Sequence, residues 1–216
     1  LGPIKPADWQ NRRFILSTYD EGTEFSKLAY QKTKEAQETA LSFEALWART
    51  KDPKMQVKGI YRDLGREFEA EFEELVKKEK WTVETSIPGR GATNAWQERR
   101  HRDTVAEGRA ALLQSGLPNK LWSLAIEHSN FNSNRKDRPE AIDPKRRKSP
   151  YFRVYGKDAA EALVPFGTGI MMKDDGVAKG EKFRARAIIG VVVGYGPHGS
   201  YRVIDCRLYT SDAAAD

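Results

Sequence analysis

The sequence has few of the residues on which disulfide-rich domains and zinc modules depend. It contains one cysteine, Cys206, and three histidines in 216 residues. A single cysteine excludes an intramolecular disulfide framework and fits a reducing compartment. His101, His128 and His198 are far apart in the sequence, so with one cysteine they cannot form a His/Cys zinc module of the usual spacing.

Long apolar runs are also missing. No stretch approaches the roughly 18 residues that a membrane span needs, and no signal peptide is visible, so we expect no membrane partner. The chain begins at Leu1 rather than at a methionine, which predicts a fragment of a longer protein.

Basic residues outnumber acidic ones. There are 37 Lys and Arg against 31 Asp and Glu, a formal net charge of +6. A positive balance favours polyanionic partners, although many basic proteins bind none. Composition therefore leaves nucleic-acid binding open, and the motifs have to decide it.

Apolar periodicity predicts strands alternating with helices up to about residue 135. The first strand is expected at 13–19 with a hairpin partner at 24–31, and further strands at 56–62 and 81–85. Helices are expected at 34–49, 67–80, 94–115 and 119–135. The aromatic residues on their apolar stripes are expected in the core, namely Trp47, Phe72, Trp122 and Phe131.

The character of the chain changes after residue 133. Residues 134–148 (NRKDRPEAIDPKRRK) hold seven basic residues, three acids and two prolines, and are predicted to be an extended basic linker. Residues 149–206 are predicted to be a small β-rich unit after the core of residues 1–133. Residues 207–216 resemble translated sequencing-adapter sequence and are expected to be a non-native tail.

Three acids stand at informative places in this pattern. Asp20 follows the first strand, Asp63 ends the second good strand, and Glu98 lies in the first turns of the long helix. Carboxylates that converge from neighbouring strands and a crossing helix can hold Mg²⁺, which prefers oxygen ligands. Each acid alone is more often a solvated or capping residue, so the combination carries the prediction.

Three motifs around these acids resemble copia-type retrotransposon integrases. Residues 59–68 (GIYRDLGREF) resemble the Arg-(Ser/Thr)-Asp-Asn-Gly-Gly-Glu-Phe pattern of that family. Residues 84–88 (ETSIP) resemble its Glu-Thr-Ser-x-Pro stretch, and residues 94–99 (NAWQER) its Asn-Gly-x-x-Glu-Arg. Asp63 and Glu98 are 35 positions apart, close to the family's spacing.

The resemblance extends over about residues 1–205. Upstream, residues 1–4 (LGPI) and 14–20 (FILSTYD) look like the start of the family's catalytic core. Downstream, the resemblance continues through residues 112–122 (LLQSGLPNKLW), 149–151 (SPY), 155–156 (YG), 164–167 (VPFG) and 190–195 (GVVVGY). The order and spacing of these motifs are more specific than any one of them.

The resemblance implies an α/β, RNase H-like fold with a mixed five-stranded sheet flanked by helices. It implies that Asp20, Asp63 and Glu98 are both catalytic residues and ligands of two Mg²⁺ or Mn²⁺ ions. The implied activity is 3′-end processing of element DNA and its transfer into target DNA. The implied partners are DNA and further copies of the chain, acting in the nucleus after a cytoplasmic particle stage. The family's upstream His/His/Cys/Cys zinc module has no counterpart here.

Several positions depart from the family pattern. Leu64 stands where the family usually has Asn, Arg66 and Ala95 where it has Gly, and Glu21-Gly22 where it has Asp-Tyr. Leu64 removes a polar group beside the predicted site, and such losses often weaken metal affinity. The departures leave an inactive copy as an alternative.

Basic residues near the site predict nucleic-acid contacts. Arg99 and Arg102 flank Glu98, and phosphate contacts by arginine position DNA without reading its sequence. A solvated helix face explains them equally well. The basic run Lys145, Arg146, Arg147 and Lys148 is predicted to grip phosphates or to act as a nuclear import signal, with a merely soluble linker as the alternative.

Other functions fit the same sequence. A related RNase H-like nuclease or transposase is the alternative among enzymes. A non-catalytic nucleic-acid-binding remnant of a retroelement is the alternative among binding proteins, and an expressed pseudogene fragment would have no function. Binding of divalent ions would separate the enzymes from the binding module.

Overall fold

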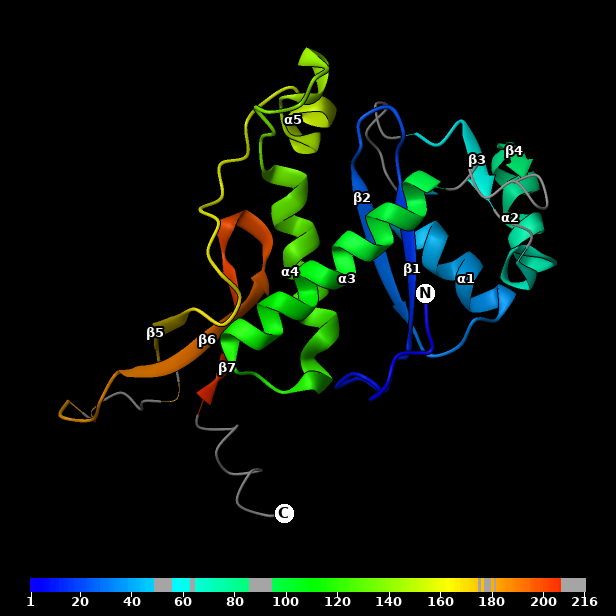
Figure 1. Cartoon of the computed structure of the whole chain (residues 1–216). Helices are drawn as coiled ribbons and strands as arrows, with labels where there is room; N and C mark the ends of the chain where they lie inside the picture. The colour runs from blue at the N-terminus through cyan, green and yellow to red at the C-terminus, as the bar shows by residue number, and fades with distance from the viewer. Residues whose placement is uncertain are drawn as a thin grey trace.

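The computed structural model describes residues 1–48, 56–62, 65–85, 95–174, 176, 180 and 182–206, without the side chains of residues 48, 95–97 and 145. Asp63 and Leu64, the predicted tail and the loop of residues 86–94 before the long helix lie outside these residues. The described strands are β1 (Phe14–Tyr19), β2 (Ser26–Gln31), β3 (Gly59–Arg62), β4 (Thr82–Thr85), β5 (Gly169–Lys173), β6 (Ala187–Tyr195) and β7 (Tyr201–Asp205). The described α-helices are α1 (Ala36–Phe43), α2 (Glu71–Glu79), α3 (Ala95–Ser115), α4 (Trp122–Arg135) and α5 (Pro150–Tyr155) (Figure 1).

The strands are divided among three small sheets. β1 and β2 form an antiparallel hairpin, β3 and β4 a parallel pair, and β5, β6 and β7 an antiparallel sheet. The expectation of one mixed five-stranded sheet is therefore wrong for the described residues. The reason lies at β1, whose second edge meets Leu1 and not β3: Ile15 N donates to Leu1 O at 2.9 Å, and Leu1 N donates to Ile15 O at 2.8 Å.

The hairpin separates two hydrophobic cores. Successive side chains of a strand point to opposite faces, so Leu16 packs with α1 and α2, whereas Ile15 packs with α3 and α4. In Figure 1, α3 crosses the hairpin on one side and α1 lies on the other. Because β1 has apolar residues on both faces, helices pack against both sides of it.

The core beside α1 confirms the aromatic prediction for Phe72 and Trp47. Phe72 is fully buried and its ring meets the Phe43 ring edge to face, with centroids 5.4 Å apart. The Trp47 indole is buried as well, and its Nε1 donates to Thr18 Oγ1 at 2.8 Å. Such edge-to-face pairs stabilise beyond the area that they bury.

The second core holds α4 between the hairpin and the β5–β7 sheet (Figure 1). Trp122 and Ala125 of α4 are buried there, as its apolar stripe predicts. Phe131 is half-buried, and its ring stacks on Tyr195 with centroids 4.0 Å apart. Aromatic contacts therefore hold the β5–β7 sheet against α4.

The helices and strands predicted from periodicity are largely confirmed, with shorter ends. The segment predicted as an extended linker is more ordered than expected, because a short 3-10 helix spans Pro144–Arg146. No helix in the described part of the chain is both long and apolar enough to cross a membrane.

Candidate functional site

Asp20 lies directly after β1, where its carboxylate closes the hairpin turn. Its Oδ2 accepts hydrogen bonds from Thr23 N at 2.8 Å and from the Thr23 hydroxyl. The backbone closes the same turn, because Asp20 N donates to Phe25 O at 2.9 Å. Aspartate often caps its own turn in this way, so Asp20 has a structural role whether or not it also binds metal.

Of the other two predicted ligands, the structure describes only Glu98. Glu98 is exposed in the first turn of α3. Asp63 falls outside the described residues. Among the residues that the structure describes, no three His, Cys, Asp or Glu side chains are grouped so that they could hold a metal ion. The three-acid site therefore stays a prediction that depends on Asp63.

The arginines after Glu98 divide by exposure. Arg99 and Arg102 are exposed and three positions apart, so they lie on one face of α3. Arg100 turns inward instead: its Nη2 lies 3.5 Å from Ser26 Oγ. Burial lowers the pKa of Arg100, and the positive charge of the neighbouring Arg138 is the second-largest cause of this shift.

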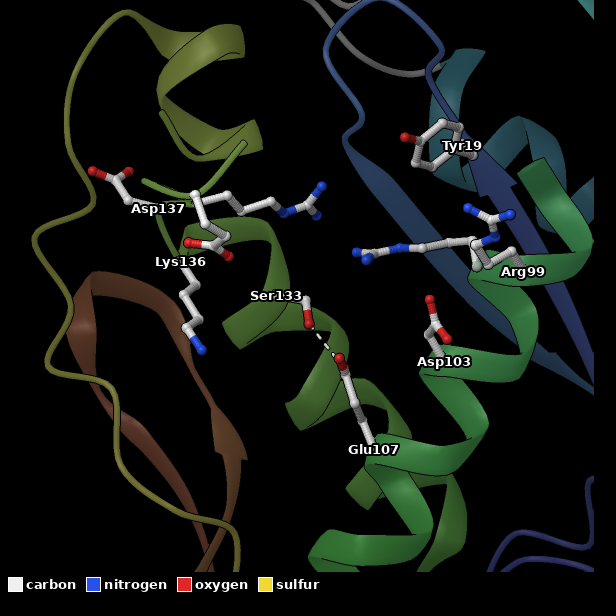
Figure 2. A pocket seen from close by; sticks show the side chains of 10 residues that line it. Tyr19, Arg99, Asp103, Glu107, Ser133, Lys136 and Asp137 are labelled. Atoms are coloured by element: carbon white, nitrogen blue, oxygen red, sulfur yellow. Dashed lines mark hydrogen bonds between the residues drawn. The ribbon is translucent and has the colours of Figure 1, made fainter. Parts of the chain in front are cut away.

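A cavity of about 290 Å³ opens between α3, the end of α4 and the segment that follows it (Figure 2). Figure 2 shows Tyr19, Arg99 and Asp103 on one wall, and Ser133, Lys136 and Asp137 on the opposite one. Glu107 bridges the two helices, since its Oε2 accepts from Ser133 Oγ at 2.8 Å. The complete lining holds four basic and four acidic side chains together with Tyr19 and Ser133.

Next to this cavity, Glu24 is buried among arginines, a feature that the sequence did not reveal. Its side chain is 2% exposed. Arg138 Nη1 and Arg153 Nη2 each approach Glu24 Oε2 to 2.8 Å, and Arg146 Nη1 lies 3.1 Å from Oε1. We call these four residues the Glu24 cluster. No local signal predicts it, because the arginines follow Glu24 by more than a hundred positions.

Part of the predicted basic run forms ion pairs within the protein, with Glu24 and with nearby aspartates. Arg146 pairs with Glu24, and Lys148 lies 3.3 Å from Asp137 and 3.1 Å from Asp158. Arg147 is exposed, with its Nε donating to Ala141 O at 3.2 Å. The side chain of Lys145 lies outside the described residues. The described side chains of the run thus contact other residues of the chain, and their contact with nucleic acid stays a prediction.

Tyr19 stands where the cavity meets the Glu24 cluster. Burial, followed by the nearby Glu24 carboxylate, raises the pKa of Tyr19 to about 12. The hydroxyl is therefore protonated at neutral pH.

Two asparagines of α4 hold the hairpin in this position. Asn134 Oδ1 accepts from Ser26 N at 3.0 Å, and Asn134 Nδ2 donates to Ser26 O at 2.8 Å. Asn130 Nδ2 also donates to Ser26 O, at 3.2 Å. All three residues are buried, where satisfied hydrogen bonds matter most. The start of β2 is thereby fixed against the helix whose end lines the cavity.

The architecture can be compared with known proteins. The sequence matches no family model and none of the curated proteins. The structure is similar to the catalytic core domain of BIV integrase, with a TM-score of 0.50 and 21% sequence identity, over 66% of this chain and 85% of that one. The chain has an integrase-core-like fold. At this identity the likeness concerns the α/β fold alone, and the resemblance of the motifs to copia-type elements is a separate argument.

Proposed function

We propose that the chain is an integrase-class enzyme that cuts DNA and joins DNA strands, derived from the polyprotein of a copia-type retroelement. The observation that carries the proposal is the likeness to the BIV integrase catalytic core over 85% of that domain. The motifs around Asp63 and Glu98 support the same class, because fold alone does not specify function.

We infer that Asp20, Asp63 and Glu98 are the acids that bind Mg²⁺ or Mn²⁺. Two such ions would stabilise the attacking and leaving oxygens of a phosphoryl displacement. The described residues do not complete this ligand set by themselves, and Asp20 already accepts two hydrogen bonds from Thr23. Asp63 is therefore the residue whose substitution tests the proposal most directly.

The basic residues beside Glu98 are consistent with DNA as the expected partner. Arg99 and Arg102 are exposed beside Glu98, where their guanidinium groups would contact DNA phosphates and position the strand. The polymeric substrate, action as a homo-oligomer and location in the nucleus all follow from the proposed class.

The test uses the purified chain, a duplex oligonucleotide carrying the element end, and Mg²⁺. We expect strand-joining products on a denaturing gel, abolished by Asp63→Asn and by Glu98→Gln. Glu71→Gln is the matched control, because Glu71 is an exposed acid in the first turn of α2. Joining that survives Asp63→Asn would refute the assignment of Asp63.

A non-catalytic nucleic-acid-binding remnant is the second candidate. Leu64 and Arg66, which stand where the family has Asn and Gly, favour it. In that case the chain would bind the duplex equally well with Mg²⁺ or with EDTA, Asp63→Asn would not change the affinity, and no joined product would form.

A further inference from the structure

Positive charge is in excess beside the cavity. The Glu24 cluster sets three guanidinium groups against one carboxylate. Arg100 adds a fourth, which lines the same cavity as Arg138. Asp143, 3.6 Å from Arg146, offsets only part of this charge.

Arg100 is the least compensated member of the group. No carboxylate of the described residues lies within ion-pair distance of it, and its Nε is buried without a hydrogen-bond partner in the structure. A buried donor on a charged group costs free energy unless something accepts from it. Arg100 therefore lines the cavity with hydrogen-bonding capacity that the described residues do not use.

The acids of the cavity do not supply that acceptor. Asp103, Glu107, Asp137 and Glu140 are all exposed, whereas Arg100 and Arg138 are half-buried. Glu107 accepts from Ser133, and Asp137 accepts from Ser149 N at 2.8 Å. The four carboxylates are therefore more exposed to solvent than these two arginines.

We propose that this cavity binds a phosphate group, with Arg100 and Arg138 as its guanidinium donors. Planar guanidinium groups match phosphate oxygens in pairs, and desolvation strengthens such bonds. The phosphate belongs to a DNA backbone if the proposed function holds, or else to a small phosphorylated molecule. The site itself needs no metal.

The first test is thermal unfolding of the full chain in inorganic phosphate and in chloride at equal ionic strength, without divalent metal. Phosphate stabilises many proteins through exclusion from their surface. The evidence for binding is therefore the difference between variants in the phosphate-dependent rise in Tm. We expect Arg100→Gln to lose at least half of the phosphate-dependent rise in Tm, and Arg109→Gln to keep it. Arg109 is the control because it is an exposed arginine further along α3.

The same measurement separates a binding role from a structural one. An uncompensated buried charge destabilises the empty protein, so in chloride Arg100→Gln should melt at or above the wild-type Tm. Should Arg100→Gln not fold, Arg100→Lys keeps the charge without the planar fork and is expected to lose part of the phosphate response. An equal phosphate response in wild type and in whichever variant folds would overturn the proposal.

The second test identifies the source of the phosphate. Duplex binding is followed by fluorescence anisotropy over a range of salt concentrations. If the ligand is a DNA phosphate, Arg100→Gln lowers the slope of log K against log salt by about 1 relative to Arg109→Gln. An unchanged slope together with a lost thermal response assigns the site to a small phosphorylated molecule. Neither test requires strand joining, so the failure of the proposed enzyme activity would be seen separately.

Discussion

Arg153 Nη2 donates to Glu24 Oε2 at 2.8 Å, although the two residues are 129 positions apart. This bond joins α5 to the turn between β1 and β2. Glu24 has a left-handed backbone with φ of 59°, an uncommon conformation for a non-glycine residue. The ion pairs of the Glu24 cluster accompany that conformation and connect the hairpin to the segment after α4.

The substitution Glu24→Gln tests the cluster. Removing one partner of a buried ion pair leaves the others uncompensated and typically costs about 3–5 kcal/mol. Because Arg138 and Arg146 are 30% and 44% exposed, water screens part of this effect. We expect a loss of about 2 kcal/mol in the free energy of unfolding, measured by urea denaturation.

Glu21→Gln is the matched control for Glu24→Gln, since Glu21 is an exposed glutamate of the same turn. It should change the free energy of unfolding by less than about 0.5 kcal/mol. Equal losses in the two variants would mean that the buried pairs contribute nothing.

His128 makes stability depend on pH. It is 3% exposed and stacked on Tyr195, and burial lowers its pKa below the ordinary 6.5, partly opposed by a hydrogen bond with the Val164 backbone. Below pH 6.5 the imidazole of His128 binds a proton in the unfolded chain more readily than in the folded chain. The free energy of unfolding therefore falls as pH decreases towards the folded pKa. The free energy of unfolding should therefore be lower at pH 5.5 than at pH 7.

His128→Phe removes the titrating group and keeps a ring in the aromatic stack. We expect this variant to lose less stability than the wild type between pH 7 and pH 5.5. His198→Gln, at an exposed histidine, should follow the wild type. If His128→Phe also followed it, the buried imidazole would not be the cause.

Gly108 permits the close approach of α3 and α4. A Cβ at this position would lie 2.4 Å from Ile126 Cγ1 and 3.1 Å from Ile126 Cα. In an exposed helix Gly→Ala stabilises by about 1 kcal/mol, but here overpacking costs about 1–3 kcal/mol. We predict a net loss of stability and a weaker phosphate response, since both helices line the cavity. A gain in Tm for Gly108→Ala would contradict the packing.

Asp20→Asn distinguishes the two roles of that residue. An amide oxygen can still accept from Thr23 N, so we expect the free energy of unfolding to change by less than about 1 kcal/mol. Loss of the negative charge should abolish Mg²⁺-dependent strand joining if Asp20 is a ligand, as we propose. Full activity in a folded Asp20→Asn would leave Asp20 as a turn residue only, and Thr23→Val would then show how much the turn depends on it.

Local pattern was sufficient for much of the fold. The β-forming residues around Ile15 and Leu16 predict a strand, and the stripe through Trp122 and Ala125 predicts α4. These are properties of periods of two and 3.6 residues, so the sequence carries them without knowledge of distant contacts. The expected five-stranded sheet failed because strand pairing is not local, and the backbone at Leu1 meets the edge of β1 that β3 was expected to fill.

The sequence by itself determined the order of the elements, the first hairpin and the basic character of α3. Only the tertiary structure decided which charges meet. Arg99, Arg100 and Arg102 are alike in the sequence, yet only Arg100 turns inward towards Ser26, and Glu24 finds arginines more than a hundred positions away. Helix and strand periods follow from interactions between near neighbours, whereas the pairing of charges follows from how the finished elements pack together.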